Sequence, residues 1–330
     1  MIENYIASLP KAELHLHIEG TFEPELIFKL ADRNKVKLPY ASVEALRKAY
    51  EFTDLQSFLD LYYACMNVLR TEEDFAELAN AYFEKASKQN VVHAEIFFDP
   101  QAHTQRGISF DTVIDGLWSA VKNSKKNFGI TSKLIMCFLR DQSAESAMET
   151  LNQAIPYGER IVAVGLDSAE RGNPPSKFAE VFAKARACGF HATAHAGEEG
   201  PTEYVWEAIN ILKVKRIDHG VRSLEDPKLV QHLVESAIPL TVCPLSNVKL
   251  RVFDKMTDHN IKDMLDAGLH ATINSDDPAY FGGYIGENYR SVHEALDLQQ
   301  ADLIKLAVNS INASFLTHTE RQEYLTLFED

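Results

Sequence analysis

Short, mostly apolar runs alternate along this chain with longer amphipathic stretches. Turn residues flank each apolar run, as expected for parallel strands that are buried on both faces. The amphipathic stretches between them are typical of helices; one starts with Asp226-Pro227, and another ends at Gly189. The alternation predicts a parallel sheet covered by helices. The predicted strands are residues 12–17, 91–98, 133–139, 161–166, 190–195, 216–219, 239–243 and 269–274.

About eight strands with helices between them favour an α/β fold, a closed (β/α)8 TIM barrel. An open doubly wound sheet is the alternative, although no GxGxxG motif follows the first strand. We expect a single domain over residues 1–330, with a helical insertion after the first strand at about residues 20–90. Apolar positions such as Leu55, Phe58 and Tyr62 recur there at helical spacing. The insertion either covers one end of the barrel as a lid or only decorates it.

The composition is that of an ordinary globular enzyme. Of the 330 residues, 45% are hydrophobic and 25% are charged, and the net charge is −15. An acidic surface disfavours binding to nucleic acids or to anionic membranes, and no apolar run is long enough to cross a bilayer. The four cysteines are scattered, which is typical of reduced thiols. We therefore expect a cytoplasmic protein without nucleic-acid or membrane partners, and the sequence makes no prediction about its oligomeric state.

Histidines and acidic residues occur at or just after several predicted strands. His15 and His17 lie two residues apart in the first strand, so both side chains point to the same face. His195 ends another strand, and Asp276 follows the last one. Any one of these features could be a buried, hydrogen-bonded polar residue. Together, three imidazoles and one carboxylate at barrel strand ends suit a divalent ion such as zinc, with a water molecule at an open position.

Five motifs, in this order, carry a resemblance to a known family: LPKAELHLHIEG, HAGEE, RIDHG, CPLSN and NSDDP. The chain resembles the adenosine/adenine deaminases of the metal-dependent amidohydrolase superfamily from about Leu9 to beyond Tyr284. The resemblance implies a TIM barrel, one zinc ion per chain, and hydrolytic removal of the 6-amino group of a purine. The HxE and PCxxC signature of the other zinc deaminase class is absent from the sequence.

The resemblance also implies roles for individual residues. Glu198 protonates N1 of the purine, which requires a buried carboxyl with a raised pKa. His219 orients the attacking hydroxide or accepts its proton. Asp277 accepts a hydrogen bond from N7–H of the ring. The remaining histidines that lie on helix or loop patterns are expected to be solvated; they are His232, His259, His293 and His318.

The chain is more similar to the adenine group of this family than to the adenosine group. Glu170 stands where nucleoside enzymes tend to have glycine, and Glu19 stands where they often have aspartate. Either longer side chain would fill the volume of a ribose, and Glu170 could accept a hydrogen bond from N9–H of adenine. We therefore predict zinc-dependent deamination of adenine to hypoxanthine and ammonia, serving purine salvage or nitrogen scavenging.

Three alternatives remain at this stage. The substrate could be adenosine or an N6-substituted adenine. Iron or manganese could replace zinc in a site built from nitrogen and oxygen ligands. The chain could also be a silent purine-binding protein, although the residues that such a relative would lose are all present.

Overall fold

The computed structural model describes residues 2–52 and 55–329, with only the backbone for residues 55–57. Its described residues form eight parallel strands in the order β1 to β8, each paired with the next. The strands are β1 (Lys11–His17), β2 (Val91–Phe98), β3 (Thr131–Leu139), β4 (Ile161–Asp167), β5 (His191–Ala196), β6 (Arg216–His219), β7 (Leu240–Val242) and β8 (Ala271–Ile273).

The ends of the sheet meet just beyond β8. Leu16 and Asp276 form a parallel bridge, and the Asp276 backbone exchanges hydrogen bonds with His15 and His17. The strands therefore form a nearly closed TIM barrel, which confirms the predicted fold class. All eight predicted strands are present, with ends shifted by no more than two residues. The open doubly wound sheet is ruled out.

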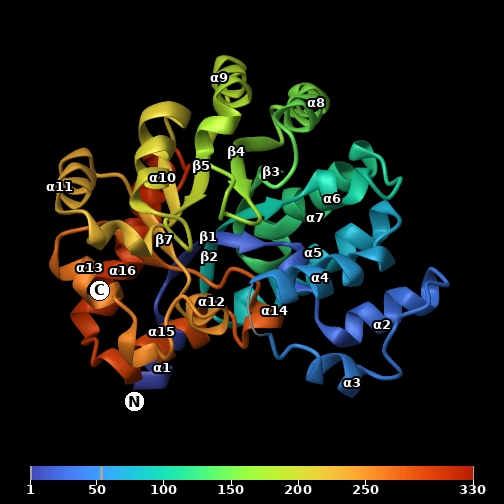
Figure 1. Cartoon of the computed structure of the whole chain (residues 1–330). Coiled ribbons are helices and arrows are strands. Elements are labelled where there is room, and N and C mark those ends of the chain that lie inside the picture. Colours follow the sequence, from blue (N-terminus) through green and yellow to red (C-terminus); the bar gives the residue numbers. More distant parts are fainter. Residues whose placement is uncertain (1, 53–54, 330) are drawn as a thin grey trace.

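Helices surround the barrel, as Figure 1 shows. Those that follow β2 to β7 are α6 (Pro100–Thr104), α7 (Phe110–Phe128), α8 (Ala144–Ala154), α9 (Ala179–Ala187), α10 (Thr202–Glu207), α11 (Pro227–Ser236), α12 (Pro244–Lys249) and α13 (Ile261–Asp266). The N-terminal helix and those after β8 are α1 (Ile2–Ser8), α14 (Pro278–Phe281), α15 (Ile285–Leu296), α16 (Gln300–Ala313) and α17 (His318–Leu325).

The predicted insertion between β1 and β2 is helical. It contains α2 (Pro24–Arg33), α3 (Val43–Lys48), α4 (Leu55–Cys65) and α5 (Glu72–Lys88). Side chains of α4, among them Phe58 and Tyr62, line a cavity at the carboxyl ends of the strands. The insertion therefore contributes to the wall of this cavity, which goes beyond decoration. Because its apolar residues also join the main core cluster, we infer that the chain is one domain.

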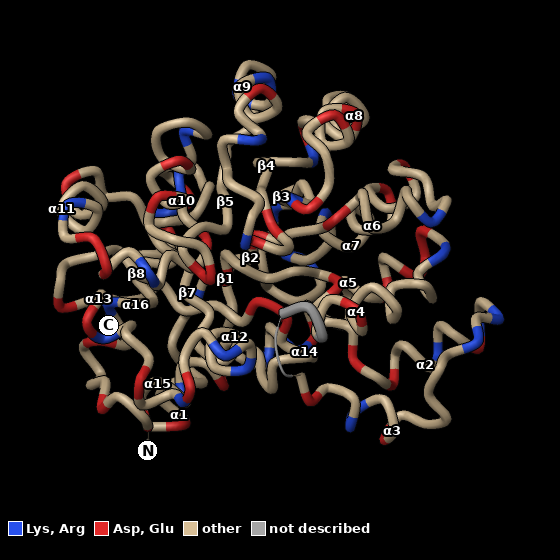
Figure 2. Tube along the Cα trace, in the orientation of Figure 1, with Lys and Arg blue, Asp and Glu red and all other residues tan. Residues whose placement is uncertain are grey.

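Charged residues of both signs are spread over the outer helices, including α9 and α11 (Figure 2). None of the helices within residues 2–52 and 55–329 combines the length and the apolarity that crossing a bilayer needs.

A buried ion pair lies inside the barrel, below the cavity. Arg216 Nη1 donates to Glu95 Oε2 at 2.6 Å, and Nη2 donates to the Leu14 carbonyl at 3.0 Å. Both side chains are fully buried. Burial raises the pKa of Glu95, but the charges and hydrogen bonds of Arg216 and His93 together outweigh burial and hold the pKa at about 2. Removing either partner therefore leaves an uncompensated charge inside the barrel.

Arg216→Met is expected to lower the free energy of unfolding by about 3–5 kcal/mol, the usual cost of breaking a buried pair. Urea unfolding measures this change. The double variant Arg216→Met/Glu95→Met, which removes both charges, is expected to recover part of the loss. A single variant within 1 kcal/mol of wild type, about the size of an exposed pair, would show that the interaction contributes little.

Candidate active site

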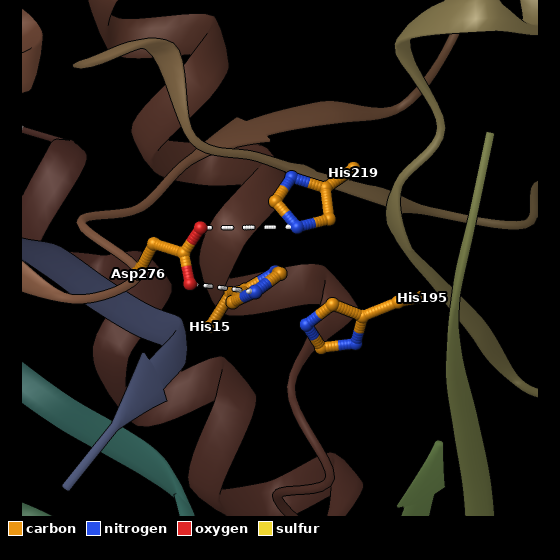
Figure 3. A group of neighbouring side chains, drawn as sticks. All are labelled: His15, His195, His219 and Asp276. Carbon is orange, nitrogen blue, oxygen red and sulfur yellow. Dashed lines mark ion pairs between the residues drawn. The ribbon is translucent and has the colours of Figure 1, made fainter. Parts of the chain in front are cut away.

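Side chains from four strand ends converge at the carboxyl end of the barrel. His15 and His17 come from β1, His195 from β5, His219 from the end of β6, and Asp276 from the loop after β8. All five are at most 6% exposed. Figure 3 shows His15, His195 and His219 turned toward the Asp276 carboxylate. The four predicted metal ligands are therefore brought together, and His219 lies beside them.

The distances between these groups fit shared ligands of one ion. His17 Nε2 lies 3.2 Å from His195 Nε2 and 3.6 Å from Asp276 Oδ1, and His15 Nε2 lies 3.5 Å from the same oxygen. In a five-coordinate site with an open position for water, metal–ligand bonds of about 2.0–2.1 Å place neighbouring ligand atoms roughly 2.9–3.6 Å apart. His15 Nε2 is buried and has no hydrogen-bond partner among the described residues.

The other ring nitrogens of these histidines lie near oxygen atoms that can accept a hydrogen bond. His15 Nδ1 lies 3.2 Å from the Thr241 carbonyl oxygen, and His17 Nδ1 lies 3.5 Å from Asp167 Oδ2. His195 Nδ1 lies 3.6 Å from Asp218 Oδ2. An acceptor at Nδ1 keeps the proton there and leaves a lone pair on Nε2. Three lone pairs and a carboxylate that face one another are favourable only around a cation. The arrangement therefore fits a divalent metal.

His219 has the opposite tautomer, which a chain of hydrogen bonds determines. The Ile261 backbone N–H donates to His259 Nδ1 at 3.1 Å, so the proton of His259 is on Nε2, which donates to Asn247 Oδ1 at 3.2 Å. The Asn247 amide nitrogen then donates to His219 Nδ1 at 3.4 Å. His219 therefore carries its proton on Nε2, 3.5 Å from Glu198 Oε2 and 3.8 Å from Asp276 Oδ2. It is arranged as a hydrogen-bond donor beside the three histidines that are predicted to bind the metal.

The prediction that His259 is solvated is wrong, because this hydrogen-bonded residue is only 3% exposed. Burial lowers the pKa of His259 to about 3, so the imidazole is neutral. The CPLSN motif contains Asn247, but the short sequence pattern around His259 gave no sign that the two residues meet.

Burial favours the neutral form of two acidic residues in the cavity, Glu198 and Asp277. It raises the pKa of Glu198 well above its usual range, and the nearby carboxylates of Asp276 and Glu170 add to this effect. Burial and the adjacent Asp276 likewise raise the pKa of Asp277. Both carboxyls line the cavity together with His17, His195 and His219. Glu198 and Asp277 can therefore act as neutral hydrogen-bond donors.

Glu170 holds the loop that follows β5. Its Oε1 accepts the backbone N–H of Gly197 at 2.8 Å, and its Oε2 accepts those of Glu198, Glu199 and Gly200 at 3.1, 2.8 and 2.7 Å. Glu170 is fully buried and is not part of the cavity wall. These contacts position the backbone of Glu198, a different role from the substrate contact predicted for Glu170.

In Glu170→Gln, an amide NH2 group replaces one of the two oxygens that accept hydrogen bonds from backbone N–H groups, so donor faces donor. We expect the free energy of unfolding to fall by about 1–3 kcal/mol, as for other unsatisfied buried groups. Glu180→Gln removes an exposed carboxylate on α9 and serves as the control for the lost charge. Equal stabilities of the two variants in urea unfolding would contradict the anchoring role of Glu170.

Both the sequence and the fold of this chain are similar to those of known proteins. Residues 10–329 match the family model described as adenosine deaminase. An adenine deaminase of Acinetobacter baylyi is 60% identical over 320 residues, which are 97% of this chain and 96% of that protein. The crystal structure of an adenine deaminase from Arthrobacter aurescens is 52% identical and has a TM-score of 0.95, over 96% of this chain and 97% of that one.

A crystal structure of an amidohydrolase from Burkholderia ambifaria with bound zinc is 26% identical, with a TM-score of 0.91 over 98% of this chain and 90% of that one. The family match, the identities to relatives over nearly the full length, and the shared fold all agree. This chain belongs to the adenosine deaminase family.

Proposed function

We propose that this protein is an adenine deaminase, which hydrolyses adenine to hypoxanthine and ammonia with one zinc ion per chain. The converging Nε2 atoms of His15, His17 and His195 beside Asp276 carry the proposal. The adenine deaminases that are 52–61% identical over nearly the whole chain support the choice of substrate.

His15, His17, His195 and Asp276 would hold the zinc ion. Bound zinc supplies a water molecule whose pKa is lowered to about 7, so that a nucleophile is available at neutral pH. The Nε2–H of His219 donates to the attacking oxygen, orients it toward C6 of the purine and stabilises its negative charge. Of the two roles that the sequence left open for His219, its tautomer favours this one.

Glu198 supplies the proton that makes C6 reactive. Attack at C6 places a pair of electrons on N1, and the neutral Glu198 carboxyl donates its proton there. The hydroxyl proton of the added oxygen then moves to the amino group, so that the C–N bond breaks, ammonia leaves and the oxygen becomes the carbonyl of the 6-oxopurine. The proton released from the attacking water restores the Glu198 carboxyl. The burial of Glu198, which is 5% exposed, keeps this proton in place until the substrate binds.

The rest of the cavity fits a flat aromatic ring. Phe58, Leu59, Leu250 and Phe281 supply apolar walls. Free adenine mainly carries its ring proton on N9, so N7 presents a lone pair. We assign the N7 hydrogen bond to a neutral Asp277 that donates to the ring, which reverses the direction predicted from the sequence.

A direct test follows the loss of the adenine ultraviolet band and the release of ammonia by the purified protein, with metal analysis of the same sample. We expect turnover of adenine far above that of adenosine or N6-substituted adenines, and one zinc per chain. A chelator is expected to abolish turnover and added zinc to restore it. A preference for adenosine would refute the proposed substrate.

Glu198→Gln keeps the shape of the side chain but removes the acidic proton. We expect kcat to fall by about 10²–10⁴-fold with zinc content unchanged, the usual contribution of a general acid. Glu199→Gln is the matched control. It makes the same change at the next residue, whose carboxyl pairs with Arg171 and has no role in the proposed reaction. Full activity of Glu198→Gln would show that another group protonates the ring.

A further inference from the structure

The cavity wall contains two more carboxyls that the proposed reaction does not use. Asp99 directly follows β2, and Asp167 is the last residue of β4. Both side chains line the same cavity as Glu198 and Asp277, and they are only 3% and 2% exposed. Burying two acidic groups side by side costs free energy, so their place beside the substrate cavity requires a physical reason.

Contacts within the protein fix Asp99 but do not satisfy its carboxyl. Its backbone N–H donates to Glu19 Oε1 at 3.2 Å, and the same oxygen lies 2.8 Å from His103 Nε2. Its carboxyl is within hydrogen-bonding reach of the Asp167 carboxyl. Neither Asp99 Oδ1 nor Asp167 Oδ1 accepts a hydrogen bond from any other described residue. The Oδ1 atom of Asp99 is therefore free to accept a hydrogen bond from a ligand.

The proposed orientation of the substrate places a donor near this acceptor. With C6 at the metal ligands, N1 at Glu198 and N7 at Asp277, the five-membered ring continues from N7 to N9. Asp99 lies close enough to Asp277 for their charges to interact, and both line the cavity. The N9–H of free adenine is the only ring N–H of that tautomer, and it needs an acceptor in a buried site.

On the basis of the proposed function, we propose that the Asp99 carboxyl accepts a hydrogen bond from N9–H of the substrate and thereby selects free bases over 9-substituted purines. In a nucleoside, carbon replaces this hydrogen, so the carboxyl would lose its donor and would face the added group. A site built to pair with an N–H rejects analogues that lack it, because its own polar group is left unpaired. Since both oxygens of Glu170 bind backbone N–H groups, Asp99 takes the role that the sequence suggested for Glu170.

A second metal ion is the competing explanation for these carboxyls. Ligand atoms of His17, Asp99 and Asp167 lie within 4.8 Å of one another. His17 Nδ1, which faces Asp167 at 3.5 Å, would then have to lose its proton. Metal analysis of the purified enzyme separates the two explanations, and we expect one metal ion per chain. Two metal ions per chain, both bound tightly enough to remain through purification, would overturn the role of Asp99 as an acceptor.

The test compares adenine with 9-methyladenine in the wild type, Asp99→Ala and Asp99→Asn. Asp99→Ala removes the acceptor, so kcat/KM for adenine is expected to fall about 10–100-fold while that for 9-methyladenine stays level or rises. Asp99→Asn retains an acceptor oxygen and can donate to Asp167, so it is expected to keep most of the preference for adenine. Equal losses for both substrates in Asp99→Ala, or loss of the preference in Asp99→Asn alone, would overturn the proposal.

Binding to the unmodified enzyme provides a measurement that does not depend on turnover or on variants that fold. Calorimetry is expected to show hypoxanthine binding to the wild type at least tenfold more tightly than 9-methylhypoxanthine. Equal affinities, or no binding of either, would refute the N9 contact even if adenine is deaminated. Conversely, a clear preference for hypoxanthine without deamination of adenine would refute the proposed activity and leave the N9 contact standing.

Discussion

The structure depends on one electrostatic constraint at the mouth of the barrel. As ligands of a metal ion, His15, His17 and His195 would direct unprotonated Nε2 atoms at one another and at the Asp276 carboxylate. The Nε2 atoms of His17 and His195 are only 3.2 Å apart. Without a cation these lone pairs repel, and burial removes the water that would otherwise screen them. A divalent ion turns the same arrangement into a stable centre. The surrounding residues keep the lone pairs directed at this point.

The parallel strands provide this support through their register. Asp218 on β6 pairs with His195 on β5 and with Thr241 on β7, so one carboxylate can reach both neighbours. Thr241 Oγ1 donates to Asp218 Oδ1 at 2.9 Å, while His15 Nδ1 lies 3.0 Å from that hydroxyl. The network therefore fixes the tautomer of His15, and it places Asp218 Oδ2 3.6 Å from His195 Nδ1. Asn247 gives His219 the opposite tautomer, so that His219 is a hydrogen-bond donor and differs from the three predicted metal ligands.

The sequence predicted the parts of this structure that depend on local pattern. The eight strands could be predicted because each is a short apolar run between turns. The candidate metal ligands could be predicted because each lies in or just after a strand; they are His15, His17, His195 and Asp276. Contacts between distant segments could not be predicted in the same way. His259 meets Asn247, and Glu170 meets the loop after β5, only because the barrel brings their loops together. Asp99 likewise follows an apolar strand whose sequence does not show which cavity it faces.

X-ray absorption spectroscopy of the purified protein at the zinc edge tests the central claim most directly. We expect a single zinc environment of nitrogen and oxygen ligands at about 2.0–2.1 Å, with imidazole scattering from three histidines and no sulfur. His17→Gln is expected to reduce that imidazole contribution. A metal bound by sulfur, a metal–metal scattering path, or a spectrum unchanged in His17→Gln would contradict it.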